Sequence, residues 1–202
     1  MLLDAKHSQV VLVDYQTKLM TVIHEADFVL ANALRLAKIA QLMQVPVWGT
    51  EQIPEKLGHN EPELRELCLK TLSKTHFSGV PDGLLPLLQG EEAVAGQGPG
   101  SVACHQDGVM ALQTLPERAS IVVAGCEAHI CLLQTALDLL AAGLEVWVVT
   151  DACSSRTERN RDAAFDRLAA AGAELVTTEM VAFEWMRDCR HEAFRNVQRL
   201  IK

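Results

Sequence analysis

The sequence of 202 residues lacks several features that would mark a membrane, secreted or nucleic-acid-binding protein. It has no apolar run of about 18 residues, the length that a membrane-spanning helix needs. Its start, MLLDAKHSQ, lacks the basic and apolar regions of a secretory signal. It has no excess of positive charge either, since 18 Lys and Arg against 26 Asp and Glu give a net charge of −8. We therefore expect a cytoplasmic protein that binds neither membranes nor nucleic acid.

Cysteine-pairing motifs are also missing. The six cysteines form no C-x-x-C pair and no zinc-binding spacing. In a reducing compartment we expect free thiols, most of them buried as small apolar side chains. At most one or two cysteines are therefore expected to take part in chemistry.

The glycine signatures of nucleotide binding are absent. The turn Asp14-Tyr15-Gln16-Thr17 after the first predicted strand has no glycine, which argues against a Rossmann dinucleotide site. The glycine-rich stretch Val80 to His105 matches neither G-x-G-x-x-G nor the P-loop. We interpret residues 80–105 as an irregular excursion from a single domain spanning 1–202. It could be a surface loop, a lid over a pocket or an oligomer contact.

Short apolar runs alternate with helical periods along the chain. The runs predict strands at Gln9–Val13, Val45–Trp48, Ile121–Ala124, Leu144–Val149 and Glu174–Thr177, with a short third strand within LSKTHF. The helical periods cover Glu25–Gln44, Ile130–Ala142 and Thr157–Ala171, with one or two more helices within Val181–Leu200. This alternation predicts an α/β fold of three layers: a doubly wound, mainly parallel sheet with helices on both faces.

In doubly wound sheets, functional residues collect at the carboxyl ends of the strands. Asp14 closes the first predicted strand, and Glu51 and Gln52 follow the second. Lys74 belongs to the short third strand, and Asp151 follows the strand that ends at residue 149. The sequence therefore predicts that these polar side chains share one edge of the sheet.

Cys131 is the candidate nucleophile at that edge. It lies in the first turn of a predicted helix, where free N–H groups and the helix dipole favour a thiolate. A nearby Lys74 would lower the thiol pKa further, and the same N–H groups could receive an oxyanion. Each residue also has a plainer interpretation: Cys131 as a packed core thiol, Asp14 as a loop cap and Lys74 as a surface lysine. Since none is expected to fill the core, substituting them should leave folding intact.

Three segments resemble a known family. VVLVDYQ, KTHFS and AGCEAHICLLQTALDLLAAGLEVWVVTDACSSR are similar to isochorismatase-like cysteine hydrolases, which include nicotinamidases and N-carbamoyl amide hydrolases. The resemblance covers nearly the whole chain and is strongest to a small single-domain branch. It implies an isochorismatase-like fold of Rossmann-like topology and a small-molecule substrate with a C–N bond. It also implies assembly into a homo-oligomer, as a dimer, tetramer or larger.

The resemblance further implies a catalytic triad of Asp14, Lys74 and Cys131. In this family the cysteine attacks, the aspartate takes its proton, and the lysine stabilises the charged pair. Ammonia or an amine leaves, and water hydrolyses the resulting thioester. The family places a cis peptide before the oxyanion turn, which corresponds here to Cys126–Glu127. The backbone N–H groups of Glu127 and Cys131 are then the expected oxyanion donors.

The chain departs from nicotinamidases at the metal site. Those enzymes bind a metal through an Asp-x-His pair after the second strand, where this chain has Thr50-Glu51-Gln52. His59 stands alone and is interpreted as a loop histidine. We therefore expect no metal and no other cofactor.

The pocket over Cys131 is expected to be lined by Tyr15, Trp48, Phe77, His129 and Asp151, of which Tyr15, Phe77 and His129 are the candidate substrate contacts. Two other functions stay open. One is a catalytically idle binding or scaffold module of the same fold. The other is a thiol redox protein that uses Cys126 and Cys131.

Overall fold

The structure is a computed structural model that describes residues 1–90 and 117–202. These residues form a six-stranded sheet of order β3-β2-β1-β4-β5-β6 in which every neighbouring pair is parallel. The strands are β1 (Ser8–Val13), β2 (Val47–Gln52), β3 (Lys70–Lys74), β4 (Ser120–Gly125), β5 (Glu145–Val149) and β6 (Glu174–Val176). This is the strand order of Rossmann-type sheets, so the predicted α/β fold is confirmed.

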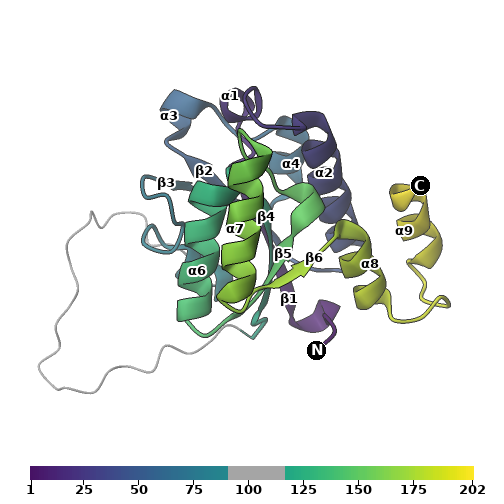
Figure 1. The fold of residues 1–202 in the computed structure, drawn as a ribbon. Helices are drawn as coiled ribbons and strands as arrows, with labels where there is room; N and C mark the ends of the chain where they lie inside the picture. The colour runs from purple at the N-terminus through teal and green to yellow at the C-terminus, as the bar shows by residue number, and fades with distance from the viewer. Residues whose placement is uncertain (91–116) are drawn as a thin grey trace, which may run out of the picture.

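Helices cover both faces of the sheet, as predicted. Figure 1 shows α6 and α7 side by side on one face, while α2 packs with α8 and α9 on the other. The α-helices are α1 (Thr17–Met20), α2 (Ala26–Leu42), α3 (Pro54–Leu57), α4 (Pro62–Leu67), α5 (Leu84–Leu88), α6 (Leu133–Ala141), α7 (Glu158–Ala170), α8 (Thr178–Met186) and α9 (Phe194–Ile201). Short helical turns are η1 (Ala5–His7), η2 (Ala128–Leu132), which is a π-turn, and η3 (Thr150–Ala152). No helix in the described part of the chain is both long and apolar enough to span a bilayer.

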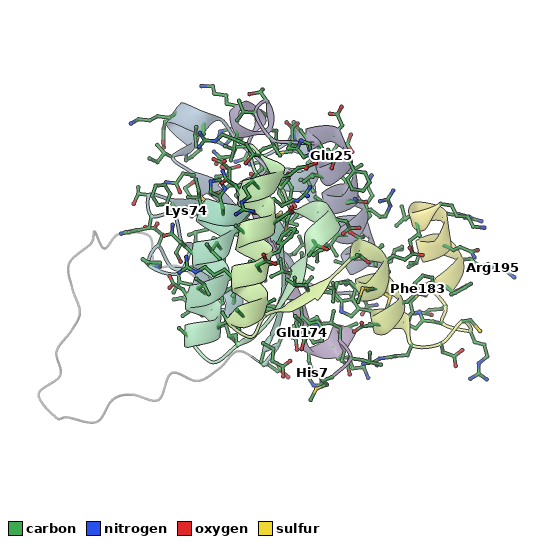
Figure 2. All side chains as sticks on the ribbon, in the orientation of Figure 1. His7, Glu25, Lys74, Glu174, Phe183 and Arg195 are labelled. Carbon is green, nitrogen blue, oxygen red and sulfur yellow. The ribbon has the colours of Figure 1, made fainter. Side chains whose placement is uncertain are left out.

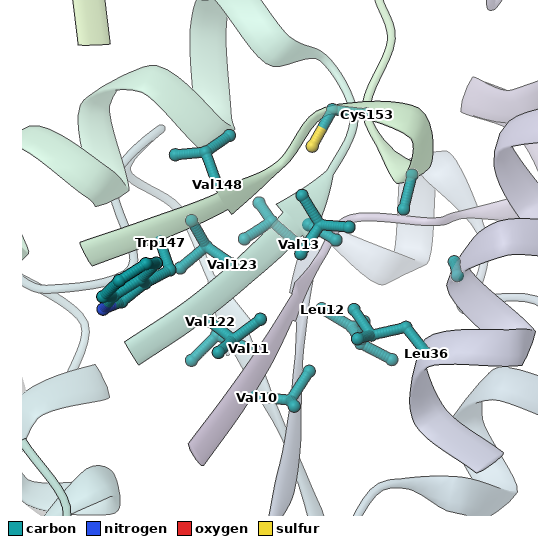
Figure 3. Close-up of a cluster of buried hydrophobic side chains, with 14 of the residues drawn as sticks. Val10, Val11, Leu12, Val13, Leu36, Val122, Val123, Trp147, Val148 and Cys153 are labelled. Carbon is teal, nitrogen blue, oxygen red and sulfur yellow. The ribbon is translucent and has the colours of Figure 1, made fainter. Parts of the chain in front are cut away.

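The core lies around the two central strands. All six residues of β1 and all six of β4 are buried, because each strand has a neighbour on both sides and helices above and below. Figure 3 shows the side chains of 10–13 beside Val122 and Val123 of β4, with Leu36 of α2 packed from one face. Burial on both faces explains the continuous rather than alternating apolar pattern of these strands.

The second and third strands differ from their predicted bounds. β2 continues to Gln52, so Glu51 and Gln52 belong to the strand and do not follow it. β3 begins at Lys70 and ends at Lys74, earlier than the segment LSKTHF suggested. The polar residues at the end of β2 are buried and partnered, so hydrophobicity alone could not locate the strand end.

The helix that carries Cys131 begins earlier than predicted. The helix was predicted to begin at Ile130, but helical backbone already begins at Ala128 with η2. This turn leads directly into α6. The predicted region Val181–Leu200 contains two helices, α8 and α9.

The predicted excursion at 80–105 is described only in part. Residues 84–88 form α5, and residues 91–105 lie outside the described residues, as does any role for them as a lid or oligomer contact. The buried amide of Gln9 donates to the carbonyls of Leu88 (3.1 Å) and Arg118 (2.8 Å). Because Gln9 lies near the start of β1, Leu88 and Arg118 are held at the edge of the sheet opposite Asp14.

Candidate active site

A buried ion pair lies at the carboxyl edge of the sheet. Asp14 directly follows β1 with a positive φ of 54°, and Lys74 is the last residue of β3. The Lys74 Nζ is 2.7 Å from Asp14 Oδ2, and both side chains are fully excluded from solvent. Figure 2 places Lys74 toward the same end of the molecule as Glu25, away from His7. The surface interpretation of Lys74 is therefore wrong.

Two side chains from β2 hold this ion pair in place. The Thr50 hydroxyl donates to Asp14 Oδ1 at 2.7 Å, and Lys74 Nζ donates to Gln52 Oε1 at 2.6 Å. Gln52 is the register partner of Lys74 in the sheet. Thr50 and Gln52 are two residues apart in a strand, so their side chains point to the same face. Gln52 was expected at this edge of the sheet, but its contact with Lys74 and the role of Thr50 were not predicted, although the period of two was the available signal.

The turn after β3 supplies further acceptors for the lysine. Lys74 Nζ donates to the carbonyl oxygens of Phe77 (3.0 Å) and His76 (3.3 Å). A buried ammonium is costly unless it is paired and hydrogen-bonded. Here the aspartate supplies the opposite charge, while Gln52 and two backbone carbonyls supply the hydrogen-bond acceptors.

Cys131 faces the same ion pair. Cys131 lies in η2 and is 7% exposed, and its thiol is near enough to Asp14 and Lys74 for both charges to shift its pKa. Burial raises the Cys131 pKa from 9.0 to about 12; the Asp14 carboxylate also raises the pKa, and the Lys74 ammonium lowers it. The predicted thiolate is therefore wrong for the resting protein. Desolvation outweighs the effect of the Lys74 ammonium.

This pKa leads to a direct expectation for Cys131. The difference in thiolate ultraviolet absorbance between the wild type and Cys131→Ser should be negligible at pH 7 and grow only above about pH 10, because the pKa is raised to about 12. Cys189→Ser is the control that removes an exposed thiol instead. A thiolate signal from Cys131 at neutral pH would contradict the raised pKa.

The turn between β4 and η2 has the backbone form that the resemblance implied. The Cys126–Glu127 peptide bond is cis. Gly125, just before it, packs so closely that any side chain would collide with the Val13 carbonyl oxygen. Ala128 N–H donates to the Ser154 carbonyl at 2.8 Å, which fixes the turn against the loop after β5. The N–H groups of Glu127 and Cys131 remain the predicted oxyanion donors.

A second ion pair borders this turn. Arg156 donates two hydrogen bonds of 2.9 Å to the two oxygens of the buried Glu127 carboxylate. His129 Nδ1 lies 3.0 Å from Ser155 Oγ, and its Nε2 lies 3.3 Å from Asn160 Nδ2. The two-pronged contact with Arg156 holds the side chain of the residue whose N–H is a predicted oxyanion donor.

Three predicted pocket residues have structural roles instead. Tyr15 is fully buried, and its hydroxyl donates to the Ala152 carbonyl. Asp151 accepts from the backbone N–H and hydroxyl of Thr178 at the start of α8 (2.8 and 3.0 Å). Trp48 lies in the first half of β2 and donates to Gln9 at 2.8 Å, near the opposite edge of the sheet. Full burial removes Tyr15 as a substrate contact, and the side chains of Asp151 and Trp48 are engaged by α8 and by Gln9, so these three are corrected as pocket residues.

Phe77 and His129 remain candidates for substrate contact. Phe77 is 55% exposed, and its own carbonyl binds Lys74. His129 is partly buried in η2, two residues before Cys131. Phe77 contacts Lys74 through its carbonyl, and His129 shares η2 with Cys131, so both remain predicted substrate contacts beside the predicted triad.

The polar end of β2 is occupied by protein contacts. Besides Thr50 and Gln52, the buried Glu51 carboxylate accepts from Asn60 N–H at 2.9 Å and lies 3.0 Å from His59 Nδ1 and 3.4 Å from Arg65 Nε. Within residues 1–90 and 117–202, no group of three or more His, Cys, Asp or Glu side chains is arranged to hold a metal ion.

Comparison with known proteins yields matches along nearly the whole chain. A family model described as the Isochorismatase domain matches residues 8–180. Isochorismatase domain-containing protein 2B of Mus musculus is 37% identical over 191 residues, which cover 95% of this chain and 79% of that protein.

Two solved structures share the fold at a TM-score of 0.78. One is the MAR1 ribonuclease from Caenorhabditis elegans, 30% identical and covering 100% of this chain and 92% of that one. The other is YcaC from Pseudomonas aeruginosa with hexane-2,5-diol and covalent acrylamide, 25% identical and covering 97% and 89%.

Proposed function

Because the chain belongs to the isochorismatase family, we propose that it is a cysteine hydrolase that cleaves the C–N bond of a small amide-type substrate. The observation that carries the proposal is the fully buried Asp14–Lys74 ion pair at the carboxyl edge of the sheet, near enough to Cys131 for both charges to act on its thiol. A nucleophile, a proton acceptor and a cation converge there from three distant chain segments.

Asp14 is suited to accept the thiol proton. Its Oδ1 is held by the Thr50 hydroxyl. Its Oδ2 pairs with the Lys74 ammonium at 2.7 Å and has no other hydrogen-bond partner among the described residues. Oδ2 is therefore the oxygen available for a proton. Because the resting thiol is protonated, we propose that the proton moves to Asp14 as the sulfur attacks.

The reaction then proceeds in two halves. The Cys131 sulfur bonds to the carbonyl carbon, and the N–H groups of Glu127 and Cys131 stabilise the oxyanion. The C–N bond breaks as Asp14 returns the proton to the leaving nitrogen, which leaves as ammonia or an amine. Water attacks the thioester carbon and gives a proton to Asp14. The C–S bond then breaks, Asp14 returns that proton to the sulfur, and the carboxylic acid leaves with the Cys131 thiol restored. Lys74 stays charged and balances the negative charge throughout.

The other functions receive less support. For a thiol redox role, Cys126 is fully buried, and burial raises its pKa to about 12, which makes it a poor partner for exchange. The name of the Caenorhabditis elegans neighbour suggests ribonuclease activity, but a chain of net charge −8 lacks the basic surface expected for RNA binding. An idle scaffold module would give no reason for the burial of the Asp14–Lys74 ion pair.

An ammonia-release screen over small amides tests the proposal. We expect one or more amides to be hydrolysed by the wild type and by Cys189→Ala, but not by Cys131→Ala. Rapid quenching and intact mass should reveal a covalent acyl adduct on the Cys131 peptide. Turnover that persists in Cys131→Ala would refute the cysteine mechanism, and an inactive wild type with no adduct would favour the scaffold module.

The proposal also includes the substrate contacts, cofactors, location and assembly that we expect from the sequence. The substrate is a small molecule contacted by Phe77 and His129, and no metal or other cofactor takes part. We also propose a cytoplasmic protein that assembles with copies of itself. The five cysteines that the structure describes are free thiols, which suits a reducing compartment.

A further inference from the structure

The carboxylate of Asp82 organises the turn that follows β3. Its Oδ2 accepts hydrogen bonds from the backbone N–H groups of Thr75 and His76, each at 2.9 Å. The His76 ring nitrogen Nδ1 lies 3.1 Å from both carboxylate oxygens. Partial burial raises the Asp82 pKa, but the hydrogen bonds from His76 and Thr75 outweigh it, so that the pKa is lowered overall. Asp82 is therefore a charged acceptor at neutral pH.

The same turn forms part of the lysine site. The carbonyl oxygens of His76 and Phe77 both accept from Lys74 Nζ. Further along, Gly79 N–H donates to the hydroxyl of Thr135 on α6 at 3.1 Å, which ties the segment to the helix that follows η2. Asp82 thus holds the N–H groups of Thr75 and His76, next to the His76 and Phe77 carbonyls that face the buried ammonium.

We propose that Asp82 is a positioning residue for Lys74, holding the 75–77 turn so that two of its carbonyls keep the ammonium beside Asp14. Asp82 does not touch the reacting atoms. Its importance for catalysis rests on the proposed function of Lys74, but its effect on the position of Lys74 does not. The two can therefore be tested separately.

The hydrogen-bond geometry singles out a conservative variant. Because one oxygen of Asp82 accepts from both N–H groups, Asp82→Asn can place its amide oxygen there and retain both hydrogen bonds. Its amide NH2 would then face His76 Nδ1, which can accept when the ring is neutral. Asp82→Ala removes both of these hydrogen bonds and leaves the turn held by fewer contacts.

The experiment follows the Lys74 ammonium by NMR in protein with 15N-labelled lysine. Lys74 is the one buried lysine, and residues 91–116 contain none, so its ammonium protons should exchange with water far more slowly than the others. Absence of the signal in Lys74→Met assigns it. We expect exchange at least about tenfold faster in Asp82→Ala, the size expected from losing two hydrogen bonds of the turn. Asp82→Asn should stay close to the wild type.

The outcomes separate the positioning role from a general structural one. Faster exchange in Asp82→Ala with recovery in Asp82→Asn, at unchanged circular dichroism, supports the proposal. An unchanged Lys74 signal in Asp82→Ala overturns it, as does equal loss in both variants. On an amide substrate, Asp82→Ala should lower kcat and leave KM nearly unchanged. A Lys74→Met protein with normal turnover would refute the proposed function while leaving the NMR result on positioning intact.

Discussion

Asp14→Asn and Lys74→Met should each lower kcat on an amide substrate by about two to four orders of magnitude, the usual contribution of a positioned acid or base. Asn keeps the size of Asp14 but cannot hold the thiol proton. Met keeps most of the lysine stem but removes the charge beside Oδ2, 2.7 Å away. The double variant should be little slower than the slower single, because residues that act as a unit are not additive. Steady-state ammonia release measures all three.

The matched control for this series is Lys70→Met. Lys70 begins the strand that Lys74 ends, and it is exposed, so its loss should leave kcat unchanged. Losses that multiply in the double variant would show that Asp14 and Lys74 act independently. Near-normal turnover in Lys74→Met would remove the lysine from the mechanism.

The same single substitutions should also lower the free energy of unfolding, by about 3–5 kcal/mol each, because they leave one partner of a buried ion pair without the other. Both side chains are fully excluded from solvent. The double variant Asp14→Asn/Lys74→Met replaces the pair by neutral groups and should recover much of the loss. Urea unfolding of the wild type, both singles and the double gives the coupling energy directly.

This expectation corrects the sequence-based view that these substitutions leave folding intact. A loss of about 3–5 kcal/mol is a large part of the 5–15 kcal/mol typical of a domain, so activity must be measured where each variant is folded. Lys70→Met again serves as the control, with an effect within about 0.5 kcal/mol. A double variant that is destabilised by the sum of the singles would contradict a buried pair.

The fold class could be predicted from the sequence alone, and the resemblance added a proposed triad. Continuous apolar runs such as Val10–Val13 are typical of strands buried on both faces, and their alternation with helical periods predicts the doubly wound sheet. The position of Asp14 at a strand end follows from this pattern, whereas the structure placed Lys74 at the end of its strand. The resemblance placed Cys131 with them and gave the cis bond after Cys126.

The protonation state and the hydrogen-bond partners of these groups depend on packing that local sequence patterns do not encode. The Cys131 pKa depends on desolvation and on two charges brought from distant chain segments, and burial dominates, so the thiol is protonated where the local helix start suggested a thiolate. Whether Lys74 is solvated or buried is likewise set by packing. Gln52 and Asp82 gain their roles through strand register and turn geometry. Local patterns do not encode the burial of a polar side chain or its distance from residues far along the chain. These two quantities control the chemistry of the site.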